Sequence, residues 1–221
     1  GECKGLDNVY GMNIAKQVWA YCLIETGEFD EAEELLNSVS VSTSENNLVF
    51  IYCINLDYLG FLFLEKGQYV QAVQNFELAK EYYLKSNFLK DPSLQIFPHL
   101  AEAYVKKLRE QSLKNGIMPS AEELKKAGLF CRDALKRTEK WPNHQGVSMR
   151  SMAILYALTG KALKAEKLLQ KSIESTSAIG RKYETAKGYF EYGLFLQSAG
   201  RHGEAVDNFY KALQLFDETG A

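Results

Sequence analysis

The chain has 221 residues, of which 46% are hydrophobic and 24% charged, and these are the proportions of an ordinary globular protein. They exclude a disordered tail, and a formal net charge of −2 gives no global excess of positive charge for nucleic acid or an anionic membrane. Only four prolines occur, which favours long helices, because an internal proline costs about 3 kcal/mol in a helix.

A short phrase recurs along the chain. It has a glycine, often an aromatic residue two positions later, an alanine five positions after the glycine and a bulky apolar residue four further on. The alanines at 32 and 72, and those at 165 and 205, are 40 residues apart. The copies are Gly27, Phe29, Ala32 and Leu36; Gly67, Tyr69, Ala72, Phe76 and Ala79; Gly160, Ala165 and Leu169; Gly200, Ala205, Phe209 and Ala212; and a degenerate copy with Ala127, Cys131 and Ala134.

Each glycine of the phrase is expected to end one helix and to let the next begin. Glycine accepts a positive φ and so ends helices, and a short connection makes the two helices antiparallel neighbours. Ahead of each glycine lies an apolar stripe at helical spacing, such as Leu56, Leu59, Gly60 and Phe63. The sequence therefore predicts an all-α solenoid over residues 1–221, with five helical hairpins at about 10–40, 48–88, 94–140, 144–178 and 181–218.

The third hairpin is the longest copy. Asp91-Pro92 should break the chain before it, and Asn115-Gly116 should end its first helix. Ser120 and Glu123 form a capping-box pattern for a second helix from Ala121 to about Glu139. We expect this hairpin to project about two turns beyond its neighbours.

The repeat resembles the tetratricopeptide repeat, which has large, small and aromatic residues on its first helix, a glycine at the turn, and Ala, a bulky apolar residue and Ala on its second. The longer period is similar to the arrays found beside bacterial transcription activators, signalling ATPases and nucleotide cyclases. The resemblance covers nearly the whole chain. It implies a right-handed superhelix whose first helices line a concave, ligand-binding face.

The family's ligand-contacting positions, carried over by register, are expected to bind a partner here: Gln17, Tyr21, Asp57, Phe61, Tyr104, Arg150, Ile154, Phe190 and Leu194. The Lys, Asn and Arg clamp that one branch of the family uses for a carboxylate is absent from these positions. The groove reads as apolar and aromatic, which suits a helix or a hydrophobic segment. Alternatively, many of these side chains pack against the next helix.

Sequence motifs for catalysis or cofactor binding are missing: the chain has no GxxxxGK[ST], GxGxxG, GxSxG or HExxH. His99, His144 and His202 lie apart in sequence, and His144 and His202 are expected to be solvated or to cap helices. The cysteines show no zinc spacing, and Cys22, Cys53 and Cys131 are interpreted as small buried thiols in a reducing compartment. We expect no metal and no cofactor.

Charge is unevenly distributed along the chain. Residues 25–81 carry a net charge of −9, whereas residues 106–140 carry +5. The basic stretch could dock an acidic partner or a neighbouring domain, or it could be a solvated face. Its interleaved glutamates make it a poor nucleic-acid surface.

These observations predict a non-catalytic, cytoplasmic protein-interaction module, cut or processed from a longer regulator or signalling ATPase. It would bind a protein or peptide, with no membrane and no direct nucleic-acid contact. A ligand-sensing regulatory domain is the alternative, and an enzyme with an all-helical site is a third reading. A homodimer through exposed terminal helices is also open, because the last helix keeps Phe209, Leu213 and Phe216 for a further contact.

Overall fold

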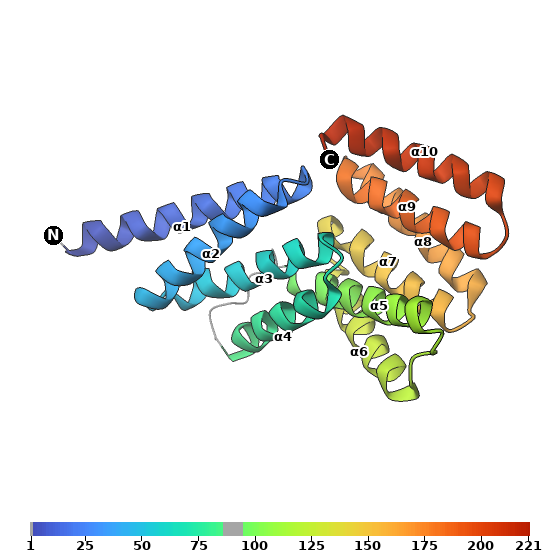
Figure 1. Ribbon diagram of the computed structural model, residues 1–221, viewed down its shortest axis with the longest axis horizontal. Helices are drawn as coiled ribbons and strands as arrows, with labels where there is room; N and C mark the ends of the chain where they lie inside the picture. The colour runs from blue at the N-terminus through green and yellow to red at the C-terminus, as the bar shows by residue number, and fades with distance from the viewer. Residues whose placement is uncertain (1, 86–94) are drawn as a thin grey trace. The chain divides into compact units, whose positions relative to one another are not determined.

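The computed structural model describes residues 2–85 and 95–221, and side chains from Asn8 onward within these ranges. Ten helices and no strand occur in this part of the chain (Figure 1). In order they are α1 Glu2–Glu25, α2 Phe29–Glu45, α3 Val49–Glu65, α4 Tyr69–Lys85, α5 Ile96–Asn115, α6 Ala121–Thr138, α7 Pro142–Leu158, α8 Ala162–Ala178, α9 Lys182–Ser198 and α10 His202–Thr219. Among the described helices, none is long and apolar enough to cross a membrane.

The chain divides into two compact units, here called unit 1 (Gly1–Ile96) and unit 2 (Phe97–Ala221). Unit 1 holds the hairpins α1/α2 and α3/α4, and unit 2 holds α5/α6, α7/α8 and α9/α10. One continuous array over both units stays a prediction, and each unit is treated by itself below.

The glycine of the repeat phrase ends a helix wherever it occurs. The φ angles of Gly27, Gly67, Gly160 and Gly200 lie between 71° and 83°, and residues other than glycine rarely adopt such values. After Gly27, the amide of Glu28 donates to the carbonyl of Leu23 at 2.8 Å, which closes the end of α1.

Within a hairpin, the small residue of the first helix faces the bulky residue of the second. A Cβ on Gly60 would lie 2.6 Å from the Phe76 ring, and one on Gly193 would lie 2.5 Å from the Phe209 ring. The hairpins α1/α2 and α7/α8 have the pairs Ala20 and Leu36, and Ala153 and Leu169, at the same two positions. Glycine thus goes with phenylalanine and alanine with leucine, so the combined volume is conserved.

The expected projection of the third hairpin is wrong. α5 has 20 residues and α6 has 18, against 17 for α3, α4, α7, α8 and α9, so the difference is less than one turn. Gly116, with φ 66°, ends α5, and residues 116–120 form a non-helical connection. The capping box of Ser120 and Glu123 is confirmed. The predicted break at Asp91-Pro92 lies outside the described residues.

Candidate functional site

The first helices of unit 2 share a group of charged side chains, which we call the charge cluster. It consists of Glu102, Lys106 and Arg109 on α5, Arg150 on α7, and Glu184, Lys187 and Glu191 on α9. Six of these side chains are less than 13% exposed, and Arg109 is 25% exposed. Charged side chains this deeply buried are stable only when paired.

Arg150 is the centre of the cluster, and its side chain is completely buried. Its Nε and Nη2 donate to the two carboxylate oxygens of Glu102 at 3.1 and 3.0 Å, and Nη2 also donates to Glu184 Oε2 at 2.7 Å. Burial by itself raises the pKa of both carboxyl groups. The cations outweigh it: they hold the pKa of Glu102 well below its usual range and bring that of Glu184 to about 2.

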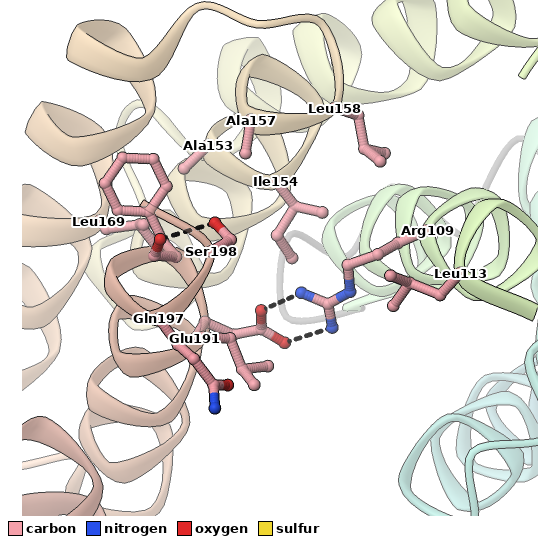
Figure 2. A pocket seen from close by; sticks show the side chains of 12 residues that line it. Arg109, Leu113, Ala153, Ile154, Ala157, Leu158, Leu169, Glu191, Gln197 and Ser198 are labelled. Atoms are coloured by element: carbon pink, nitrogen blue, oxygen red, sulfur yellow. Dashed lines mark hydrogen bonds and ion pairs between the residues drawn. The ribbon is translucent and has the colours of Figure 1, made fainter. Parts of the chain in front are cut away.

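Lys106 connects this centre to the outer end of the cluster. Its Nζ lies 3.0 Å from Glu102 Oε1 and 3.6 Å from Glu191 Oε1. Arg109 holds the same Glu191 with two parallel hydrogen bonds, the one from Nη2 to Oε1 being 3.0 Å long (Figure 2). Burial alone would raise the pKa of Glu191, but the charges of Lys106 and Arg109 have the larger effect and lower it below its usual value. This carboxylate is therefore ionised at neutral pH.

A pocket of about 390 Å³ lies beside the Arg109–Glu191 pair (Figure 2). It is formed near the C-terminal ends of the three first helices of unit 2 and is mostly aliphatic. Its walls include Leu113 of α5, Ile154 and Leu158 of α7, and Leu194 and Phe195 of α9. The charge cluster links these three helices through buried ion pairs, and these pairs fix the positions of the helices that form the pocket.

Two histidines lie in unit 2 close to buried charges, contrary to the expectation for His144. His99 and His144 are 2% and 8% exposed. Burial, followed by the charge of Lys187, lowers the pKa of His99 to about 3, so this imidazole is neutral. His202, in contrast, is exposed at the first position of α10. The interpretation of His144 as solvated or capping was wrong because α7 turns this residue toward the interior.

In unit 1, the predicted binding residues pack against neighbouring helices. Gln17 donates through Nε2 to the carbonyl of Ile51 at 2.8 Å. The rings of Tyr21 and Phe61 stack with centroids 5.4 Å apart, and Phe61 is buried. Asp57 is 2% exposed, and burial raises the pKa of its carboxyl group to about 7 despite a hydrogen bond from the backbone of Gln95.

In unit 2, the structure brings Ile154 and Leu194 together in the pocket wall. Arg150 lies in the charge cluster, and Tyr104 is buried against the Phe130 ring at 5.2 Å. Phe190 is 44% exposed and contacts the Phe209 ring at 5.7 Å. Of the predicted binding residues, Ile154 and Leu194 therefore line the pocket. The others contact neighbouring side chains of the same unit.

The sequence did not lead to the six other side chains that form the charge cluster with Arg150. The available signal was the opposite charges of Glu102 and Lys106, four apart on one helix, and of Glu184 and Lys187, three apart. Lys106 and Arg109 were counted as part of a basic flank, but they neutralise carboxylates of α9.

Of the cysteines, Cys53 and Cys131 are buried, as predicted, and burial raises the pKa of each thiol to about 12. The same prediction was wrong for Cys22, which is exposed. Residues 2–85 and 95–221 contain no group of His, Cys, Asp and Glu that could hold a metal ion.

The outer face of α10 exposes an apolar stripe. Val206, Tyr210 and Leu213 are 48%, 67% and 55% exposed. The residues 40 positions earlier, on α8, contact α9: the Tyr192 hydroxyl donates to Glu166 and accepts from Gln170. Of these three α8 residues, Ile173 is buried, Glu166 is partly buried and Gln170 is exposed. The outer face of α10 is thus equivalent to a face of α8 that contacts the next helix inside unit 2.

These features define a helical-repeat protein of the tetratricopeptide type, with antiparallel hairpins, glycine turns and a small-to-bulky pair in the hairpins α1/α2, α3/α4, α7/α8 and α9/α10. The family described as the SusR N-terminal TPR domain matches residues 3–175, and the chain belongs to that family. No curated protein matches the chain in sequence.

Solved structures support the same fold. BtubC (BKLC) from P. vanneervenii is 16% identical in sequence and has a TM-score of 0.60. The match covers 96% of this chain and 83% of the BtubC chain. The Q17M form of a putative kinesin light chain from Podosopora anserina, with nearly identical TPR-like repeats, is 19% identical over 93% of this chain and 94% of its own, with a TM-score of 0.54. At these identities the likeness shows the fold alone, and it confirms the predicted all-α repeat class.

Proposed function

We propose that this chain is a non-catalytic protein-binding module and that the pocket of unit 2 receives aliphatic side chains of a partner segment. TPR-type repeats generally mediate protein–protein interaction, and membership of this family supports the proposal. The observation that carries the site is the aliphatic pocket of about 390 Å³, formed by the three first helices of unit 2 and Leu169 of α8. Concave apolar pockets between helices are common places for a ligand to bind.

The pocket also offers a matched pair of leucines for a test. Leu113 lines the pocket and is 79% exposed, whereas Leu163 of α8 is 86% exposed and is not among the lining residues. Neither leucine is part of the packed interior. A charge can therefore be placed at either position with little effect on folding, and Leu113→Asp should act on binding alone.

The experiment begins with peptides selected on the wild-type chain from a random library of 15-residue peptides displayed on phage. Their affinities are measured by fluorescence anisotropy for the wild type, Leu113→Asp and Leu163→Asp. We expect Leu113→Asp to weaken binding by about tenfold or more, because it puts a charge into an apolar contact, and Leu163→Asp to change it less than twofold. Equal binding by wild type and Leu113→Asp would reject this pocket as the site.

A ligand-sensing regulatory domain is the second candidate, and the pocket volume favours it. About 390 Å³ falls within the range of sites for small molecules. A ligand of the native state raises Tm. A panel of amino acids and short aliphatic acids should then include a compound that stabilises the wild type and leaves Leu113→Asp unchanged. A panel without such a compound would leave the peptide site as the better explanation.

Self-association through the two end helices is a further part of the proposed interactions. Met12 and Trp19 on α1 are 53% and 54% exposed, and they occupy the repeat positions of Thr185 and Tyr192, with which α9 contacts α8. Because α10 exposes the opposite half of that same contact, α10 of one copy should pair with α1 of another, head to tail.

Two variants, each blocked at one end, test this pairing. Wild-type chain should form oligomers at high concentration, whereas Trp19→Asp and Leu213→Asp should each be monomeric. An equimolar mixture of the two variants should form a one-to-one dimer in sedimentation velocity. A mixture that stays monomeric, or a wild type that shows no concentration dependence, would contradict the head-to-tail contact.

A further inference from the structure

The outer face of α6 carries a row of basic side chains, here called the basic stripe. Along this helix and the turn after it, four cations and one leucine follow each other at three- and four-residue intervals: Lys125, Leu129, Arg132, Lys136 and Lys140. Side chains at this spacing lie on one face of a helix. All five are exposed, and the buried residues of α6 lie on the opposite side.

The cations of the basic stripe have no counter-charge inside the protein. Within residues 2–85 and 95–221, none of the four forms an ion pair or donates a side-chain hydrogen bond. Other cations of the same basic stretch of sequence are already bound, since Arg137 holds Asp133 at 2.9 Å and Lys106 and Arg109 belong to the charge cluster. The four charges of the stripe are therefore available to an outside partner.

The stripe distinguishes α6 from the other second helices of the repeat. Its five positions lie two residues before the alanine of the repeat phrase, here Ala127, and two, five, nine and thirteen residues after it. The same positions hold three carboxylates and no cation on α2, two carboxylates and one cation on α4, one of each on α8, and two carboxylates and no cation on α10. Packing within the repeat therefore does not require cations here, which favours binding of a partner of opposite charge.

Leu129 indicates which kind of anionic partner suits the stripe. This side chain is 54% exposed and lies between Lys125 and Arg132. A phosphate backbone binds through charge and gains nothing from an exposed leucine, whereas a protein segment with an aliphatic side chain can bury it. The exposed Glu122 and Glu139 lie near the two ends of the stripe and would repel a continuous polyanion.

We propose that the basic stripe binds an acidic helix of a partner protein, which lies along α6. Carboxylates of this helix meet the four cations, and an aliphatic side chain on the same face covers Leu129. From Lys125 to Lys140 the stripe is about 22 Å long, which matches about four turns of a partner helix. None of its residues lines the pocket, so this contact goes beyond the proposed function and does not depend on it.

A peptide selection with the pocket blocked isolates this surface. Random 20-residue peptides displayed on phage are selected on Leu113→Asp alone and on Leu113→Asp combined with Arg132→Gln and Lys136→Gln. A third chain combines Leu113→Asp with Lys167→Gln and Lys171→Gln. We expect Asp and Glu to be enriched at three- and four-residue spacing around Leu, Ile or Val on the first and third chains, and this enrichment to be lost on the second.

The third chain is a matched control. Lys167 and Lys171 are exposed on α8 in the same unit, and neither forms an ion pair in the described ranges. Replacing them removes the same charge as the substitutions in the stripe. An effect of Arg132→Gln and Lys136→Gln that the control lacks therefore belongs to the stripe.

The best peptide is then compared with a peptide of the same residues in scrambled order, by fluorescence anisotropy. We expect the wild type to bind the selected order about tenfold more tightly, and Arg132→Gln with Lys136→Gln to weaken binding about five- to tenfold. Leu129→Gln should weaken it about threefold, because it removes the apolar contact. Binding should fall as salt rises from 50 to 500 mM. Because every substituted side chain is exposed, Tm should stay unchanged.

Other occupants of the stripe would give different results, each of which overturns the proposal. No acidic enrichment, or an equal loss in the α8 control, would leave only a general attraction by positive charge. A DNA duplex or phosphatidylserine vesicles that bind more tightly than any selected peptide, without dependence on Leu129, would assign the stripe to phosphate groups. Self-association that is lost in Arg132→Gln with Lys136→Gln would assign it to the acidic outer face of α2 in a second copy. The pocket proposal is unaffected by these results, because its test depends on Leu113.

Discussion

Asp57 in unit 1 and Arg150 in unit 2 occupy the same position of the repeat, three residues before the small residue of the first helix, yet their surroundings differ. Both side chains are buried. Arg150 lies between two carboxylates, whereas no opposite charge lowers the pKa of Asp57, and its Oδ1 has no hydrogen-bond partner in the described part of the chain. The repeat therefore sets where a side chain lies, and the neighbouring hairpins decide whether a charge there is stabilised.

Removing the guanidinium of Arg150 should have the largest effect on stability. Arg150→Ala leaves Glu102 and Glu184 buried beside each other with fewer cations, which should cost unit 2 about 3–5 kcal/mol. The two tryptophans lie in different units, so urea unfolding followed by Trp141 fluorescence in a Trp19→Phe background reports unit 2. Lys114→Ala removes an exposed pair and should cost less than about 0.5 kcal/mol. A loss no larger than this control would mean that the cluster does not support the fold.

The two units should also respond to pH in opposite directions. The pKa of Asp57 is raised from 3.8 to about 7, so the native state of unit 1 favours the protonated form, and its stability falls as pH rises from about 4 to about 7. A shift of this size corresponds to a loss on the order of 4 kcal/mol between these limits. The lowered pKa values in unit 2 act the other way: stability is complete above the unfolded pKa and is lost as pH falls through the folded values.

Unfolding of each unit between pH 3 and pH 8 measures these slopes, with Trp19 fluorescence in Trp141→Phe reporting unit 1. Asp57→Asn should flatten the dependence of unit 1 above pH 4 and make this unit more stable at pH 8. The same slope in the Asn variant would show that another group causes it.

The close contact between the small residue and the bulky residue of a hairpin should be transferable between the units. Gly60→Ala should cost unit 1 about 1–3 kcal/mol, because the new Cβ meets the buried Phe76 ring and the crowding exceeds the gain in helix propensity. Adding Phe76→Leu should recover most of the loss, since it recreates the alanine–leucine pair of α7/α8. Gly203→Ala is the control, because no atom lies within 4 Å of its Cβ position. A double variant no more stable than Gly60→Ala would show that the pairs are not equivalent.

The sequence predicted the hairpins well because their signals are local. A glycine with positive φ, an alanine at fixed spacing and an apolar stripe can all be recognised within one repeat, and Ser120 with Glu123 marks a helix start within four residues. The exposed apolar face of α10 could be predicted only in part. Leu213 was expected to be available for a further contact, whereas the exposed Val206 and Tyr210 were not.

The binding site was harder to predict from the sequence. Ile154 and Leu194 were chosen by register and do line the pocket, but Arg109 and Glu191 were not chosen. These two residues are 82 positions apart and form an ion pair only because α5 and α9 meet in unit 2. Whether a charged residue faces solvent, a partner or a buried counter-charge depends on such distant neighbours.

Periodicity thus determined the class of this protein: an all-helical repeat of about 40 residues per hairpin, with each turn and each small-to-bulky contact encoded within the hairpin. The tertiary structure alone decided which buried charges are paired, that one cation of the charge cluster reaches the pocket, and that Asp57 stands without such pairing. The reason is physical: helix formation and hairpin packing depend on residues close in sequence, whereas the cost of a buried charge depends on every group that surrounds it in space.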